Sequence, residues 1–242
     1  MPQLQRITEI DAHGGPVAKY KDRGGNEATP TRAGRYIIGL IDQHVTQGSA
    51  YPFSRVPWGA ALRTGKDGAM EVNMNGGWKK LSAVVKTSKY FKTEKELTDY
   101  LKDYYASFKY KDGKALPDRW VFNDFGHITI KYFRDLNGDR VLNKGRETFM
   151  SDFIHTTPYD EAYTAVGKKD FVLEESHGCI HLRPADIDSL ISKRYLKRGN
   201  TIEIHPYTDK VVPTLLMRKE AKPFFEFHVF PGINKAAVYS VH

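Results

Sequence analysis

The sequence predicts a mainly β protein with α-helical insertions, of the α+β class, and three observations support this prediction. Short runs rich in β-branched and aromatic residues recur between turn signals of Gly, Pro and Asn. Apolar residues at helical spacing are clear in only two places, near 93–110 and after residue 184. A hydrophobic fraction of 40% with 12% aromatic residues argues against disorder, and 242 residues suffice to bury a core.

Strands are predicted from these runs in chain order, beginning with an opening strand or linker. Asn75-Gly76-Gly77 is a strong hairpin turn signal. We expect one strand to deliver His155 toward a site, and the last two strands to pair with the N-terminal segment. The predicted strands span 4–11, 17–20, 35–41, the two arms of 70–81, 120–134, 148–156, 201–205, 224–230 and 236–242.

Two helices are predicted, and each has recognisable ends. Thr93 and Glu96 form a capping box at the start of the first. Its aromatic-rich apolar face begins at Leu97, and we interpret this face as core rather than as a platform for sugar rings. Pro184 lies in the first turn of the second helix, and Gly199 closes it. Acidic residues near its start and basic residues near its end complement the helix dipole.

The stretch 135–139 begins like a calcium loop, with Asp, Asn and Asp at alternate positions. The likeness then fails, because Arg140 stands where the loop requires Gly and Arg146 where it requires a bidentate Glu. We therefore predict a type I′ turn at Asn137-Gly138 and no calcium.

Charge and composition limit the partners and the compartment. The net charge of +8 favours polyanionic partners, such as an acidic wall polymer. No nucleic-acid partner is expected, because no DNA- or RNA-binding signature is present. No membrane span is expected either, since no apolar run approaches the required length. The first residues lack a secretory signal, so we expect a cytoplasmic protein, an unconventional export route, or a signal already removed. A single Cys excludes an internal disulfide, and no cofactor is expected.

The stretch Ser176-His177-Gly178-Cys179 contains the only cysteine. A lone Cys near several His is a candidate nucleophile, because an imidazole takes the thiol proton and then holds the thiolate. A neighbouring His⁺ lowers a thiol pKa of about 8.5 by several units. If 177–181 is extended, His177, Cys179 and His181 share one face. The alternative is a small buried hydrophobe without chemistry, but the His, Ser and Arg neighbours favour an active site.

This stretch, with His155 upstream, resembles the signature of the L,D-transpeptidases of the YkuD (ErfK/YbiS/YcfS/YnhG) family. That signature is a His, a gap and then Ser/Thr-His-Gly-Cys. Residues 29–37 are similar to the Thr-Pro-Thr-x-Gly-x-Tyr stretch near the start of these domains, and 56–60 to a further strand-edge segment. The gap of twenty residues, 156–175, is somewhat longer than usual and suggests a polar loop or lid over the site.

The resemblance implies a mixed β-sandwich with one helix after the nucleophile and a helical insertion at about 86–118. It places the catalytic domain at 29–205. Residues 1–28 are then an N-terminal extension, and residues 206–242 a C-terminal β extension packed on the same domain.

The resemblance also implies acyl transfer on peptidoglycan stem peptides. Cys179 attacks the carbonyl between the third, diamino-acid residue of a tetrapeptide donor and the terminal D-amino acid, which leaves. The acyl group then passes to an amine of a second stem, to a free D-amino acid, or to water. The family roles make His155 the base and place His177 beside the nucleophile, and Ser176 and Gly178 complete the catalytic set. The amides around Gly178 and Cys179 are expected to form an oxyanion hole.

Four further residues are expected to contact the substrate. Many members have an Arg two positions after the Cys, where this chain has His181 and an Arg only at 183, so the cation that holds the substrate carboxylate stays open. The expected contacts are His181, Arg183, Thr156 and Trp58.

Other interpretations remain open at the level of sequence. His155, His177, Cys179 and His181 would supply a Cys/His₃ metal site, although structural zinc sites more often use several cysteines. A wall-binding module without activity is a further alternative. An active enzyme would be a wall-targeting effector exported to the periplasm, with an immunity or delivery partner, or a cytoplasmic L,D-carboxypeptidase of peptidoglycan recycling.

Overall fold

The computed structural model describes residues 3–45, 51–85, 91–107, 116–165, 171–217 and 224–241. The chain divides into two compact units, each described by itself below. The first unit comprises Met1–Asp42, Thr129–His155 and Val172–His242, and the second comprises Gln43–Ile128 and Thr156–Phe171. The described chain is mainly β with a few helices, as the sequence predicts.

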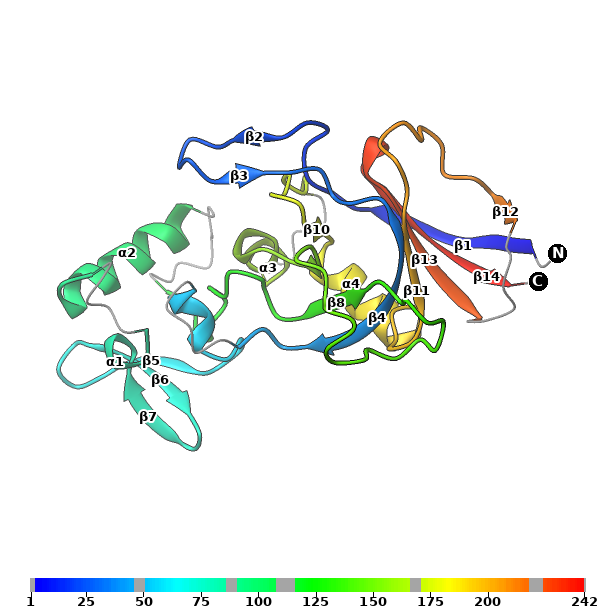
Figure 1. The fold of residues 1–242 in the computed structure, drawn as a ribbon. Helices are drawn as coiled ribbons and strands as arrows, with labels where there is room; N and C mark the ends of the chain where they lie inside the picture. The colour runs from blue at the N-terminus through cyan, green and yellow to red at the C-terminus, as the bar shows by residue number, and fades with distance from the viewer. Residues whose placement is uncertain are drawn as a thin grey trace. The chain divides into compact units, whose positions relative to one another are not determined.

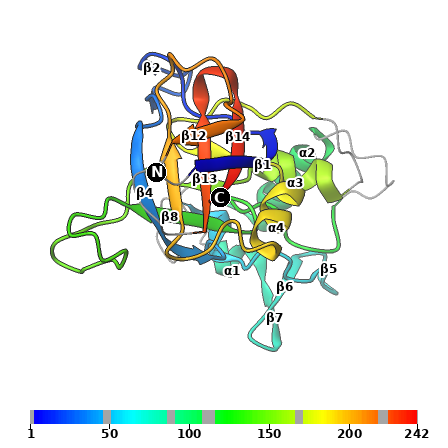
Figure 2. The same cartoon turned by 90° about the vertical axis from the view of Figure 1, so that its right-hand side faces the viewer.

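The first unit is built on one curled, mixed sheet of nine strands (Figures 1 and 2). Two neighbouring pairs are parallel, β10 with β9 and β11 with β13, and the other pairs are antiparallel. In sheet order the strands are β10 (Ile180–His181), β9 (Ile154–His155), β8 (Thr129–Phe133), β4 (Gly34–Asp42), β11 (Thr201–Ile204), β13 (Phe225–Phe230), β14 (Lys235–Val241), β1 (Gln3–Asp11) and β12 (Leu215–Met217).

The first and last segments of the described chain pair with each other in this sheet. β14 pairs antiparallel with β1, from Leu4 opposite Val241 to Asp11 opposite Lys235. A short 3₁₀ turn, Pro231–Ile233, joins β13 to β14. The predicted pairing with the N-terminal segment is confirmed for β14 but not for β13, which pairs with β11 and β14. Both strands lie inside the sheet rather than at its margin.

A partly buried ionic network joins β4, β11 and β13. The Arg35 guanidinium donates to Glu226 at 2.6 and 3.0 Å and to Glu203 at 2.7 Å. His228 Nε2 lies 3.0 Å from the second Glu226 oxygen, and His205 Nε2 lies 3.0 Å from His228 Nδ1. Burial by itself raises the pKa of Glu226, but hydrogen bonds from His228 and Arg35 outweigh it and hold the value at about 2. Glu226 is therefore an ionised carboxylate with no solvent exposure.

The first unit also contains two smaller elements. The helix predicted after Cys179 is confirmed as α4 (Pro184–Ser192), with Pro in its first turn. A two-stranded hairpin, β2 (Tyr20–Lys21) and β3 (Glu27–Ala28), stands apart from the main sheet.

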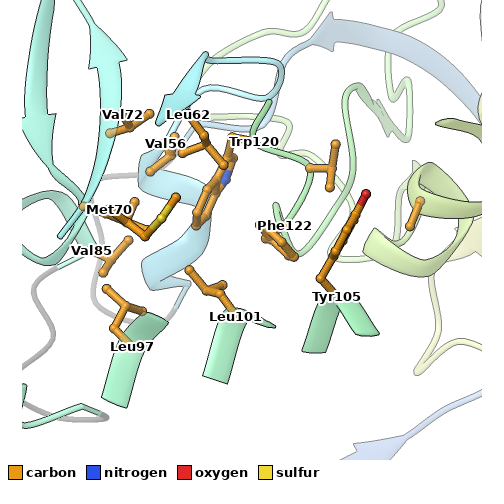
Figure 3. Close-up of a cluster of buried hydrophobic side chains, with 13 residues drawn as sticks. Val56, Leu62, Met70, Val72, Val85, Leu97, Leu101, Tyr105, Trp120 and Phe122 are labelled. Carbon is orange, nitrogen blue, oxygen red and sulfur yellow. The ribbon is translucent and has the colours of Figure 1, made fainter. Parts of the chain in front are cut away.

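The second unit combines a three-stranded meander with helices around an aromatic core. Figure 3 shows this core, in which Trp120 packs with Phe122, Leu101 and Tyr105. The strands are β5 (Leu62–Thr64), β6 (Met70–Met74) and β7 (Gly77–Lys80), which confirms the predicted hairpin at 75–77. The helices are η1 (Pro52–Arg55), α1 (Leu81–Val85), α2 (Glu94–Ser107) and α3 (Pro158–Ala165).

Helix α2 begins where the capping box predicts. The Glu96 amide donates to Thr93 Oγ1 at 3.1 Å, and Glu96 Oε2 accepts from the Thr93 amide at 3.3 Å. Leu97, Leu101 and Tyr105 are buried, so the apolar face is core, as interpreted. Residue 108, at the end of the predicted face, lies outside the described residues.

Helix α3 corrects the prediction of a polar loop over 157–175. A second capping box starts it, because Thr157 Oγ1 accepts from the Asp160 amide and Asp160 Oδ2 accepts from the Thr157 amide. Pro158 supplies the fixed φ of the first helical position. The sequence carried this signal in Thr-Pro-x-Asp, with Asp in place of the usual Glu.

The predicted type I′ turn at 137–138 is wrong. That turn needs positive φ at both central residues, whereas only Gly138 has it, at +80°. The Asp135 carboxylate organises the loop instead, accepting from the amides of Asn137, Gly138 and Arg140 at 3.3, 2.8 and 3.0 Å. Hydrogen bonds to the Asp135 side chain therefore take the place of the backbone hydrogen bonds that a two-stranded hairpin would make.

Several strands are shorter than predicted. The 120–134 run forms a strand only at β8, and the 148–156 run only at β9. The 17–20 run contributes only Tyr20 to β2. Among the residues described, none of the helices has the length and apolar character of a membrane-crossing segment.

Candidate active site

The candidate nucleophile follows a tight turn that Ser176 holds together. Its hydroxyl accepts from the Gly178 amide at 3.0 Å and donates to the Cys179 carbonyl at 2.5 Å. Gly178 has φ +135°, which residues with a side chain rarely adopt. Ser176 is buried and its amide donates to the Gly14 carbonyl. Ser176 and Gly178 therefore shape the turn.

This geometry corrects the expectation of an extended run. Residues 177–179 form a bend, and β10 begins only at Ile180. The His177 side chain is 53% exposed, whereas His181 is only 7% exposed. The two histidines thus occupy different environments and do not flank Cys179 on one extended face.

The segment before β2 packs directly against the turn. A Cβ on Gly15 would lie 2.1 Å from the Thr29 carbonyl oxygen and 3.0 Å from Gly178 Cα. Thr31 Oγ1 accepts from the Gly15 amide at 2.8 Å and donates to the Cys179 carbonyl at 3.4 Å. Two consecutive glycines, predicted only as a turn, therefore allow the close approach of three backbone segments.

The Cys179 thiol is half-buried, and burial raises its pKa to about 11. A hydrogen bond from the Phe153 backbone lowers the pKa and the negative charge of Asp152 raises it, but burial dominates. The expectation of a pKa lowered by a neighbouring His⁺ is wrong for this state. Cys179 is therefore a thiol that holds its proton at neutral pH.

His155 and His181 lie side by side on neighbouring parallel strands. They are register partners of β9 and β10, and their rings meet edge to face with centroids 4.7 Å apart. Both are buried. His181 Nδ1 donates to the Glu174 carbonyl at 2.8 Å, and burial lowers the pKa of His181 to about 4. His181 is therefore neutral near pH 7 and offers a substrate hydrogen bonds rather than charge.

Two cations lie near the turn, and both have acidic partners. Arg183 Nη1 donates to Asp11 Oδ2 at 2.7 Å. Arg32 Nε donates to Asp152 Oδ2 at 3.1 Å, and the Arg32 side chain is 57% exposed. The sequence predicted Arg183 as a substrate contact but missed Arg32 and Asp152. Asp152 touches the nucleophile's turn, because a Cβ on Gly178 would lie 3.3 Å from its Oδ1.

Trp58 and Thr156, the other predicted substrate contacts, belong to the second unit. The Trp58 ring packs on His127, with centroids 5.5 Å apart. The Thr156 hydroxyl donates to Glu161, which also accepts from the His127 amide at 2.9 Å. Within this unit Thr156 and Glu161 are buried, and Trp58 is a partly buried ring packed against the hydrophobic core.

The group of side chains best placed to hold a metal ion, among the described residues, lies away from Cys179. In the described part of the chain, the ligand atoms that lie within 4.8 Å of one another belong to Glu203, Glu226 and His228, not to the four residues around Cys179. The Arg35 guanidinium already pairs with both carboxylates of that group. A side chain thus supplies the positive charge that a metal ion would bring.

Alkylation of Cys179 is expected to show its raised pKa. The rate with iodoacetamide should still rise at pH 10, whereas the urea-unfolded chain should level off near an ordinary thiol pKa of about 8.5. A stopped-flow or mass-spectrometric rate series between pH 7 and 10 measures both. A midpoint below pH 8 in the folded protein would contradict the assignment of a protonated resting thiol.

Comparison with known proteins adds no relative. No protein-family model, no curated protein and no solved structure matches this chain.

Proposed function

We propose that the protein is a cysteine-dependent acyltransferase acting on peptidoglycan stem peptides, with the mixed β-sandwich of the L,D-transpeptidases. The supporting observation is the position of Cys179 at the head of β10, beside the strand that carries His155. Ile154 and Ile180, register partners on these strands, are fully buried. Side chains alternate along strands, so His155 and His181 lie on the opposite face from these isoleucines, with their rings in contact. The Cys179 thiol is hydrogen-bonded by the backbone of Phe153, two residues before His155.

The raised thiol pKa requires a base that acts during the attack. A thiol with a pKa of about 11 keeps its proton at neutral pH, so the S–C bond forms as the proton leaves. We assign this proton to His155, because an imidazole is the commonest general base in proteins and this one lies on the adjacent strand.

Both half-reactions then balance through one imidazole. In the first, the S–C bond forms, the C–N bond to the terminal D-amino acid breaks, and the imidazolium returns its proton to the leaving amine. In the second, an amine or water attacks the thioester carbonyl, forming a C–N or C–O bond and losing a proton to His155, while the C–S bond breaks and the Cys179 thiolate recovers that proton. The Gly178 amide already donates to Ser176 Oγ, so we assign oxyanion stabilisation to the Cys179 amide.

The cation that receives the donor's terminal carboxylate is proposed to be Arg32. His181 is neutral near pH 7, which removes it as a charge partner. The Arg32 side chain is more than half exposed, and its guanidinium is held by Asp152. Asp152 also lies near the thiol, because its negative charge raises the pKa of Cys179. A guanidinium fixed by one carboxylate keeps further donors for a second.

The test is product analysis with a defined donor. The protein is incubated with disaccharide-tetrapeptide, with and without D-methionine, and the products are weighed by mass spectrometry. Tripeptide indicates transfer to water, and dimers or a D-methionine adduct indicate transfer to an amine. Cys179→Ala should form none of these products, whereas its near-ultraviolet circular dichroism should match the parent.

His155→Gln is expected to slow product formation by a factor of about 10² to 10⁴, the usual effect of losing a positioned base. His205→Gln is the matched control, since His205 follows β11 in the first unit and is not among the residues of the candidate site. Equal rates for His155→Gln and the parent would remove His155 from the base role. Binding to sacculi that survives Cys179→Ala, with no product from the parent, would favour a wall-binding module.

A further inference from the structure

We propose that Asp22 is a positioning residue of the active site, acting through His177, and that the β2–β3 hairpin belongs to that site. The inference rests on the proposed function and extends it to a residue that the sequence prediction places in an extension. Asp22 Oδ2 lies 2.9 Å from His177 Nε2, although the two residues are 155 positions apart.

Hydrogen bonds from Asn26 hold the Asp22 carboxylate in place independently of His177. Its Oδ1 accepts from the Asn26 amide at 2.8 Å, and its Oδ2 accepts from Asn26 Nδ2 at 3.0 Å. The Asp22 amide in turn donates to the Asn26 carbonyl at 2.9 Å. The turn that joins β2 to β3 therefore fixes one orientation of this carboxylate.

This pairing decides which nitrogen of His177 carries a proton. Hydrogen bonds from Asn26 and then from His177 lower the pKa of Asp22 to about 2, so the carboxylate is ionised near neutral pH. An ionised carboxylate can only accept, and His177 Nε2 must donate. Nδ1 is then the nitrogen that can accept or exchange a proton.

The hairpin also holds the backbone around His177. The Thr29 amide and Thr29 Oγ1 both donate to the His177 carbonyl, each at 3.3 Å. The Tyr20 hydroxyl donates to Glu175 Oε1 at 3.0 Å. Contacts from both ends of the hairpin therefore bracket the histidine that precedes the nucleophile by two residues.

His177 is close enough to the site for its orientation to matter there. It contributes to the lowered pKa of His181, after burial and His13. In the proposed mechanism the thiol proton goes to His155, so His177 acts beside Cys179 through the orientation of its ring and not by taking a proton. Asp22 keeps that ring from turning away, which is a positioning role.

A double-mutant cycle tests whether Asp22 acts through His177. Asp22→Asn should lower kcat by a factor of about 10 and leave KM nearly unchanged, because the substrate contacts are untouched and only the orientation of His177 beside the reacting thiol is loosened. In a His177→Gln background the same change should have no further effect. Glu27→Gln is the matched control, since it removes an exposed ion pair with Lys19 on the same hairpin. An equal loss from Asp22→Asn in both backgrounds would overturn the inference, because Asp22 would then act on the fold.

A second measurement does not depend on activity. Nitrogen-15 NMR that reads the ring nitrogens through the non-exchanging carbon-bound protons should show His177 with the proton on Nε2 in the parent protein and in Glu27→Gln, and a loss of that preference in Asp22→Asn. The same spectrum in the parent and Asp22→Asn would overturn the pairing. If the parent transfers no acyl group but shows the expected loss, the pairing stands and the proposed function fails.

Discussion

Replacing Arg35 with methionine is expected to destabilise the first unit by about 3–5 kcal/mol, the usual cost of removing one partner of a buried ion pair. Methionine keeps much of the side-chain volume but leaves the fully buried Glu226 without its bidentate donor. The carboxylate must then either take a proton or remain a buried charge with fewer hydrogen bonds.

The measurement should follow the first unit alone. The three tryptophans, Trp58, Trp78 and Trp120, all belong to the second unit, so their fluorescence reports there. Hydrogen exchange of β11 and β13 amides in increasing urea reports on the first unit. Glu203→Gln is the matched control, because Glu203 is about one-third exposed and its loss should cost less than about 1 kcal/mol. A change below 1 kcal/mol for Arg35→Met would contradict the prediction.

Acid is expected to destabilise the first unit through His181 by up to about 3 kcal/mol, using about 1.36 kcal/mol per pKa unit. In the folded protein burial lowers the pKa of His181 to about 4, against an ordinary value of 6.5. The unfolded chain therefore binds the proton more tightly. The stabilisation is complete above about pH 6.5 and declines as the pH falls toward 4.

His181→Asn isolates this contribution, since its amide can still donate to the Glu174 carbonyl. The difference in unfolding free energy between pH 7 and pH 4.5, measured by exchange of the β9 and β10 amides, should shrink markedly in the variant. Glu226 loses its stabilising charge only below its ordinary pKa of 4.5, so it contributes little in this window. An unchanged pH dependence in His181→Asn would show that another group is responsible.

Local signals in the sequence predicted most of the elements correctly. The Thr93–Glu96 capping box located α2, because both partners lie within one helical turn. The Asn-Gly-Gly signal located the β6–β7 hairpin for the same reason. The box at Thr157 and Asp160 was equally local, and it was missed because the surrounding polar residues suggested a loop.

The contacts that define the candidate site are not local, and the sequence could not supply them. Asp22 meets His177 across 155 positions, and Arg32 meets Asp152 across 120. Neither pair follows from spacing, since the sheet topology brings the partners together. The raised pKa of Cys179 depends on the same packing, because burial rather than its sequence neighbours sets it.

The pairing of β1 with β14 also means that a strand made early in synthesis must wait for a partner that is made late. Asp11 and Lys235, which form an ion pair across these strands, are 224 positions apart. At 5–20 residues per second, a ribosome needs about 11–45 s to make that interval. Throughout this time β1 has an unpaired edge open to other chains. A chaperone that covers the nascent N-terminal strand would therefore raise the yield of folded protein more than one that acts after release.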